Sequence, residues 1–304
     1  MLMSKSKPLI FLCYGDAKNG FGHIRRAVSL FKFMLSKNRS LKIVGLSSES
    51  NTLLRSIIPQ KNILNVNPRK ISDSRILIDS PINFDDLAAV LKNRNNKIIT
   101  LDYFGDINPD INIVIYPHKD VKGDITYVGF DYVIIRNEFL KFSRTTLQKT
   151  NSSVVISLGG GDVLNQSAIV AKKLLQMGFN PTIIYGPTKN KKLINDIDEI
   201  SFLYNPKNFS ELIYHADFVI SNCGGCMFES LYFRKPTFLL PQTKREESIG
   251  QALHKLEKLV IGVGIDNLST LLSCKPNSKI SNQTSVIDGK GMQRISKILS
   301  DTHG

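Results

Sequence analysis

The chain lacks the long apolar runs that mark membrane-spanning proteins. Hydrophobic residues make up 42% of its 304 residues, but the longest apolar segments have only the length of a β-strand. Lys5 and Lys7 precede one such segment, which is too short for a secretory signal peptide. We therefore expect a cytoplasmic protein, and we keep open a peripheral contact with the inner face of the membrane.

Cysteine is scarce, and its spacing does not favour a structural metal site. The four cysteines are Cys13, Cys223, Cys226 and Cys274. Only the middle two form a C-x-x-C pair, and neither a second pair nor histidines follow at the spacing that zinc requires. Asp196 and Asp198 fall in a polar run that favours a solvated loop. We expect no metal and no other cofactor.

Basic residues exceed acidic ones but form no dense cluster. Forty Lys and Arg against 26 Asp and Glu give a net charge of +14. Such a charge attracts nucleic acid, anionic membranes or phosphorylated substrates. The basic residues are scattered and are not interleaved with aromatic ones, so we expect no specific nucleic-acid partner. A non-catalytic nucleotide-binding or nucleic-acid-binding protein is an alternative that the charge alone supports.

The most informative stretch is G-F-G-H-I-R-R at residues 20–26. It joins an apolar, strand-like run at 9–14 to a run with helical periodicity at 24–35. Glycines allow a tight turn and a close approach of ligand, and free N–H groups at a helix N-terminus favour an anion. The helix dipole disfavours a protonated imidazole, so we expect a neutral His23 that can accept a proton.

This loop matches neither common phosphate-binding motif. Arg25 occupies the third glycine position of the dinucleotide fingerprint, and no Gly-Lys-Ser/Thr follows as in a P-loop. We predict that His23 is catalytic. We predict that Asp16, Gly20, Gly22 and Arg26 shape the substrate pocket around it.

Strands and helices alternate along the chain, which predicts an α/β protein of two doubly wound, Rossmann-like domains facing a cleft. We expect an N-terminal domain at 1–145, a polar linker at 141–153 and a nucleotide-binding domain at 146–304. The final helix, near 289–300, is expected to pack back on the first domain. The expected strands are 8–14, 41–47, 75–79, 97–101, 112–116, 132–136, 154–158, 181–185, 218–221 and 237–240.

Two further glycine-rich loops follow predicted strands in the second half. Gly159, Gly160, Gly161 and Asp162 form the first, and a nucleotide diphosphate could approach their backbone closely. The second opens a helix with Asn222, Gly224 and Gly225, and Glu229 lies about one turn further on, where a carboxylate can accept hydrogen bonds from a ribose. An Asp162 helix cap and a Glu229 that only complements the helix dipole are the structural alternatives.

These motifs together resemble the two-domain glycosyltransferase-B (GT-B) superfamily, and within it the UDP-sugar hydrolases of pseudaminic acid biosynthesis, the PseG family. The resemblance rests on four motifs in the same order: residues 20–26, 129–139, 157–162 and 222–229. It implies a GT-B fold, UDP held by residues 159–162 and 224–229, and a His23 that activates water to attack the anomeric carbon.

Two positions depart from that family. A middle strand ends Asp79-Ser80-Pro81, where the family often has Asp-His-Tyr, and Arg245 and Glu246 replace a usual Asn-Gln. Gln242, after the strand-ending Pro241, is placed to reach a sugar.

The sequence is therefore compatible with two functions on the same fold. The first is a UDP-sugar hydrolase. The alternative is a glycosyltransferase in which His23 deprotonates a glycan or a lipid-linked acceptor. A basic, aromatic stretch at 25–37, with Phe31 and Phe33, is a candidate membrane contact, although ordinary core packing is favoured for it.

Overall fold

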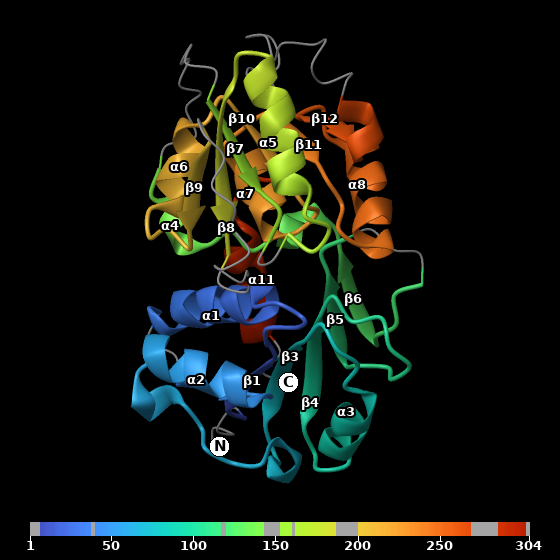
Figure 1. Cartoon of the computed structure of the whole chain (residues 1–304). Helices are drawn as coiled ribbons and strands as arrows, with labels where there is room; N and C mark the ends of the chain where they lie inside the picture. The colour runs from blue at the N-terminus through green and yellow to red at the C-terminus, as the bar shows by residue number, and fades with distance from the viewer. Residues whose placement is uncertain are drawn as a thin grey trace. The chain divides into compact units, whose positions relative to one another are not determined.

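The computed structural model describes residues 7–37, 40–116, 120–142, 153–159, 162–186, 200–268 and 285–301 (Figure 1). Its contacts divide the chain into two units. The first comprises Met1–Ile134 together with Gly289–Gly304, and the second comprises Ile135–Asp288. The expected boundary between residues 145 and 146, and most of the expected linker, lie outside the described residues.

The first unit is built on a six-stranded parallel sheet in the order β2-β1-β3-β4-β5-β6. The strands are β1 (Leu9–Cys13), β2 (Leu41–Gly45), β3 (Arg75–Asp79), β4 (Lys97–Leu101), β5 (Ile111–Val114) and β6 (Ile125–Val128). All five residues of β1 and of β3 are buried, as expected of central parallel strands that are covered on both faces.

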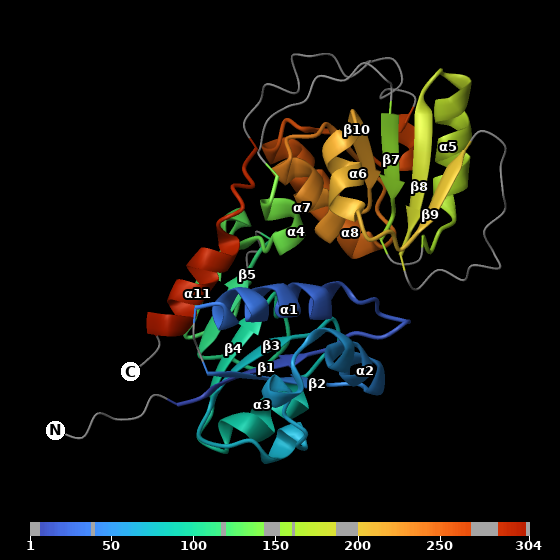
Figure 2. The ribbon, with the colours of Figure 1, turned by 90° about the vertical axis from the view of Figure 1, so that its left-hand side faces the viewer.

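Helices cover both faces of this sheet (Figure 2). They are α1 (Gly22–Leu35), α2 (Ser48–Ile57), α3 (Asp85–Lys92) and α11 (Gly291–Asp301), with short 3-10 turns η1 (Gln60–Asn62), η2 (Pro68–Lys70) and η3 (Phe130–Tyr132). The last helix, α11, packs against α1 and η3, which confirms the expected return of the C-terminal helix to the first unit.

The second unit repeats the plan with a parallel sheet in the order β12-β11-β10-β7-β8-β9. Its strands are β7 (Ser153–Ser157), β8 (Asn180–Tyr185), β9 (Ser201–Tyr204), β10 (Phe218–Ser221), β11 (Thr237–Leu239) and β12 (Val260–Val263). Its helices are α4 (Asn137–Leu140), α5 (Gln166–Gln176), α6 (Phe209–His215), α7 (Gly225–Tyr232) and α8 (Lys244–Leu256), with the 3-10 turn η5 (Ile265–Asn267). The fold class expected from the sequence is therefore confirmed.

One predicted strand is wrong. Residues 132–136 form no strand, and the sixth strand of the first sheet is β6. Val133 is buried, and Gly291 at the start of α11 lies so close to it that a Cβ there would collide with the Val133 carbonyl oxygen. Because β6 is an edge strand with largely exposed side chains, it carries little hydrophobic signal.

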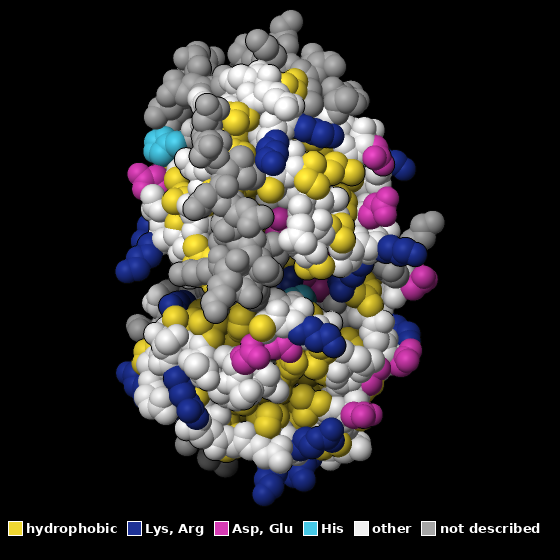
Figure 3. All heavy atoms as spheres, in the orientation of Figure 1, with side chains coloured by type: hydrophobic (Ala, Val, Ile, Leu, Met, Phe, Trp, Pro, Cys, Tyr) yellow, Lys and Arg dark blue, Asp and Glu magenta, His cyan; other side chains and the backbone are white. Residues whose placement is uncertain are grey.

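The surface and the helices bear on two predicted properties, the lack of a specific nucleic-acid partner and a peripheral contact with a membrane. On the face shown in Figure 3, Lys and Arg side chains lie apart from one another, in line with the scattered charge of the sequence. None of the helices in the described ranges is long and apolar enough to cross a membrane. Phe31 belongs to the core, edge-on to Phe11 with ring centres 5.3 Å apart, so it offers nothing to a membrane surface.

Candidate active site in the first unit

The loop before α1 is shaped by its own polar residues. Asp16 accepts hydrogen bonds from the Asn19 backbone at 2.5 Å and from the Tyr14 hydroxyl at 2.7 Å, and it pairs with Gly20 in an isolated β-bridge. Gly20 has φ +81°, a conformation that glycine adopts without strain. These contacts of Asp16 stabilise the loop at residues 16–20, which leads into α1. A contact of Asp16 with substrate stays a prediction.

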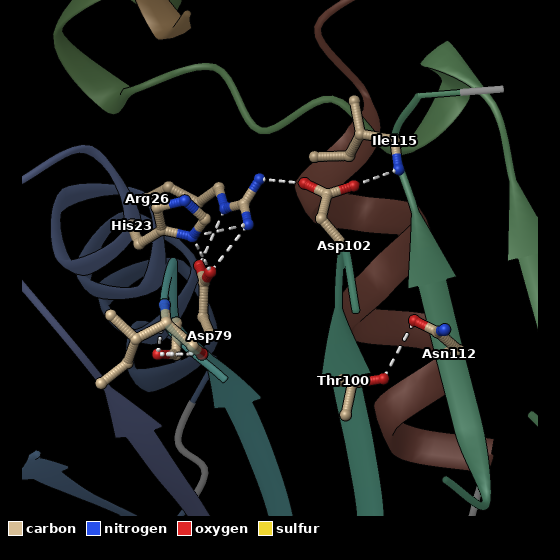
Figure 4. Close-up of polar contacts among 9 residues, drawn as sticks. His23, Arg26, Asp79, Thr100, Asp102, Asn112 and Ile115 are labelled. Atoms are coloured by element: carbon tan, nitrogen blue, oxygen red, sulfur yellow. Dashed lines mark hydrogen bonds and ion pairs between the residues drawn. The ribbon is translucent and has the colours of Figure 1, made fainter. Parts of the chain in front are cut away.

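His23 lies in the first turn of α1 and faces the carboxyl end of β3. Its Nδ1 is 2.7 Å from Oδ1 of Asp79, a carboxylate that is only 1% exposed (Figure 4). An ionised carboxylate can only accept, so Nδ1 is the donor, and this tautomer, assigned from the network, leaves Nε2 as a proton acceptor. The His23 side chain is 24% exposed.

Arg26, one turn further along α1, bridges two buried carboxylates (Figure 4). Its Nε donates to Oδ2 of Asp79 at 2.8 Å and its Nη2 to Oδ1 at 2.7 Å, which is a bidentate pair. Its Nη1 donates to Oδ2 of Asp102, at the end of β4. The 3.3 Å contact between Nη2 and His23 Nδ1 arises because both nitrogens share Oδ1 of Asp79.

The electrostatics of this group favour an ionised Asp79. Burial by itself raises the pKa of Asp79, but Arg26 and His23 outweigh it and hold the pKa at about 2. Burial likewise lowers the pKa of Arg26, whereas Asp79 and Asp102 raise it, so the guanidinium keeps its proton. Arg26 lies beside His23, as the sequence predicted, and it acts on His23 through Asp79.

Asp79 and Asp102 were not predicted as functional residues. Asp79 drew attention only as part of a departure from the PseG pattern. A usable signal was nonetheless present, since each aspartate stands at the carboxyl end of a buried parallel strand, the edge at which such sheets bind ligands.

Candidate nucleotide site in the second unit

Two of the glycine-rich loops meet at Asn222. A Cβ on Gly159 would lie 3.1 Å from Asn222 Nδ2, and one on Gly224 would lie 3.2 Å from the same atom. Gly159 also has φ +75°. Both positions therefore require glycine or a shift of the asparagine. Gly160 and Gly161 lie outside the described residues.

The carboxylate of Glu246 ties this site to the start of α8. Its Oε1 accepts from Asn222 Nδ2 at 2.8 Å and its Oε2 from the Gln242 backbone N–H at 2.8 Å. The residue that departs from the PseG pattern thus holds two loops together.

Gln242 joins the loop after β11 to the loop after β7. Its side-chain oxygen accepts from Leu164 N at 3.1 Å, and its nitrogen donates to Gln166 Oε1 at 3.1 Å. The residue is 9% exposed and borders a cavity of about 380 Å³ that Lys244 and Glu247 also line. A contact with sugar stays a prediction, because the amide already has protein partners.

Asp162 and Glu229 are both buried and bonded within the protein. The Asp162 carboxylate accepts from the backbone N–H groups of Gln166 at 2.9 Å and Ser167 at 3.2 Å, so it caps α5. Glu229, 2% exposed, pairs with Arg136, whose Nη2 donates to Oε2 at 2.7 Å. Roles of both carboxylates in nucleotide binding stay predictions.

The start of α7 has neither a side-chain cap nor an acidic residue in its first turn. Gly225 opens the helix, and Gly224 is its N-cap residue. Gly225 has nothing within 4 Å of a hypothetical Cβ, so the surface there is open. Backbone N–H groups in such a place suit a phosphate.

Within the described ranges, no three His, Cys, Asp or Glu side chains are grouped to hold a metal ion. Cys13, Cys223 and Cys226 are not joined in disulfides. Burial raises the pKa of Cys226 to about 11, so this thiol stays protonated. Cys274, Asp196 and Asp198 lie outside the described residues.

No model of an established protein family matches the chain. A relative is the uncharacterized protein MJ1062 of Methanocaldococcus jannaschii, 24% identical over 284 residues. The match takes in 80% of this chain and 58% of that protein, so the chain spans under two thirds of the relative's length.

Structural comparisons define the fold. MurG of Acinetobacter baumannii superimposes with a TM-score of 0.64 at 10% identity, covering 97% of this chain and 100% of MurG. MnaA of S. aureus, solved with UDP, gives 0.61 at 14% identity over 97% and 96%. The glycotransferase of kitacinnamycin gives 0.63 at 11% identity over 98% and 99%. The chain has the GT-B fold of these proteins.

Proposed function

We propose that the chain is a glycosyltransferase that takes its sugar from a UDP-sugar, with His23 as the general base. The observation that carries this proposal is the 2.7 Å hydrogen bond between His23 and the buried carboxylate of Asp79. It orients the ring, sets the tautomer and stabilises the imidazolium that forms when Nε2 takes a proton.

The reaction is a displacement at the anomeric carbon. The acceptor hydroxyl loses its proton to Nε2 of His23, and its oxygen forms a bond to the anomeric carbon. The bond from that carbon to the phosphate oxygen breaks, and UDP departs with the electron pair. A base positioned in this way contributes about 10²–10⁴ in rate.

UDP is proposed to bind in the second unit, at residues 159–162 and 222–225, with Glu229 at the ribose. The open start of α7, without acidic residues in its first turn, supports a diphosphate there. Two solved proteins of the same fold, MnaA of S. aureus and UGT89C1 of Arabidopsis thaliana, are complexed with UDP. We propose no metal and no cofactor.

Hydrolysis is the second candidate. The four motifs of the PseG resemblance favour it, and water would then take the place of the acceptor hydroxyl at His23. We favour sugar transfer over hydrolysis because proteins named as glycosyltransferases, SsfS6 of Streptomyces among them, share the fold. A glycan or a lipid-linked acceptor, and with the latter a position at the inner face of the membrane, belong to this proposal.

The deciding experiment incubates purified protein with a panel of UDP-sugars, with and without glycan and lipid-linked acceptors. Release of UDP only with an acceptor supports transfer, and equal release of UDP and free sugar without one supports hydrolysis. His23→Gln should lose at least about 10²-fold in turnover while still binding UDP. His215→Gln, at an exposed helix end, is the matched control. Normal turnover in His23→Gln would refute both candidates.

A further inference from the structure

The four side chains His23, Arg26, Asp79 and Asp102, here called the His23 cluster, carry an unequal number of charges. With a neutral imidazole, two carboxylates face one guanidinium, and the sum is −1. Both carboxylates are almost fully buried, at 1% and 2% side-chain exposure, so water does little to screen this excess. When His23 gains a proton, the sum becomes zero.

The excess charge comes from Asp102, which the backbone holds in place. Asp102 has φ +50°, in the left-handed region where aspartate is tolerated but uncommon. Its Oδ1 accepts from the Ile115 backbone N–H at 2.7 Å, and its own N–H donates to the Ile113 carbonyl oxygen at 2.8 Å. Figure 4 shows the carboxylate between β5 and Arg26.

Without Asp102, the positive charge of Arg26 would cancel the stabilisation that Asp79 gives to a protonated His23. A guanidinium in a bidentate pair neutralises the carboxylate that is meant to stabilise an imidazolium. A second carboxylate on the far side of the guanidinium restores the negative balance. The structure places that carboxylate where it contacts Arg26 and not His23.

We propose that Asp102 is a positioning residue that acts through Arg26, offsetting its charge so that the His23 cluster becomes neutral only when His23 takes a proton. The proposal rests on the proposed function, since it supposes that His23 is the base. The proton moves from the acceptor hydroxyl to Nε2, while the Nδ1 proton stays in its hydrogen bond to Asp79.

Among the described residues of the first unit, Cys13 is a further titratable neighbour, and it does not alter this balance. Cys13 on β1 pairs in register with Asp79 on β3, and burial together with the Asp79 charge raises the pKa of its thiol, which therefore stays neutral. The charged groups around His23 are Arg26 on α1, Asp79 on β3 and Asp102 just after β4. The chain just after β5 contributes the uncharged backbone N–H of Ile115.

The test follows the protonation of the His23 ring by NMR in the whole, ligand-free chain, so it does not depend on turnover. The signal is assigned as the one absent from His23→Gln. Asp102→Asn should lower the pH midpoint of this titration by about 1 unit, because one negative charge is lost near the ring. Arg26→Gln should move the midpoint in the opposite direction.

Controls separate charge from structure. Asp102→Glu keeps the charge and should bring the midpoint back toward that of the wild type. Asp106→Asn removes a carboxylate that is 95% exposed in the same unit and should leave the midpoint unchanged. If Asp102→Asn does not fold, Arg26→Gln and Asp102→Glu decide the question.

An unchanged midpoint in folded Asp102→Asn, or shifts of the same sign in Asp102→Asn and Arg26→Gln, would overturn the proposal. The failure of every UDP-sugar in the turnover assay would instead refute the proposed function and leave the titration result standing.

Discussion

Asp79 should make the stability of the protein depend on pH in the acid range. Its pKa in the folded protein is about 2, against an ordinary 3.8. A lowered carboxyl pKa stabilises the fold above the ordinary value, and this contribution disappears as the pH falls through the folded value. The difference corresponds to about 2 kcal/mol at neutral pH, of which about 1 kcal/mol is already lost at pH 3.

The perturbation is Asp79→Asn, and the assay is urea unfolding at a series of pH values between 3 and 7. The free energy of unfolding should be lower in the variant at pH 7, and the gap to the wild type should close by about 1 kcal/mol on going to pH 3. Asp106→Asn serves as the control for loss of one carboxylate at an exposed position. Parallel curves for wild type and Asp79→Asn would refute the assignment of Asp79 as an ionised, Arg26-paired group.

Two stability predictions concern packing and charge elsewhere. Gly291→Ala should destabilise the protein by about 1–3 kcal/mol because the added methyl meets the Val133 carbonyl, whereas Gly22→Ala, with open space around it, should not. Arg136→Met should cost about 3–5 kcal/mol by leaving buried Glu229 without its bidentate partner, and adding Glu229→Leu should recover much of that loss. Urea unfolding measures each. Equal effects of the two glycine variants, or an additive result in the double variant, would contradict these accounts.

Much of the architecture follows from local sequence pattern. The buried run that became β1 is apolar throughout, and that of β3 is apolar between Arg75 and Asp79. The glycine turn before α1 is visible as a motif, so the loop with His23 could be placed at a strand end. The strand β6 could not be found in this way, because Ile125 and Val128 are 48% and 42% exposed. The apolar segment at 133–135, a few residues further along the chain, has the hydrophobicity typical of a strand but forms none.

The partners of His23 could not be predicted for a related reason. Asp79 reaches the ring because β3 lies beside β1 with Cys13 and Asp79 in register. The sequence does not state which strands are neighbours, and it gives no sign that Asp102 adopts a left-handed backbone. The pairing of Glu229 with Arg136 likewise joins residues on α7 and just before α4, and only the folded second unit brings them together.

The placement of α11 has a consequence for how the molecule is made. The second unit is inserted into the first along the sequence, because the chain leaves the first unit after Ile134 and returns to it at Gly289. Arg75 on β3 donates to the Leu299 carbonyl at 2.7 Å, so a strand synthesised early finds this partner only after α11 has been translated. The first unit therefore cannot complete its fold before α11 has been synthesised, and a fragment that ends near residue 134 would lack the helix that packs against α1 and η3.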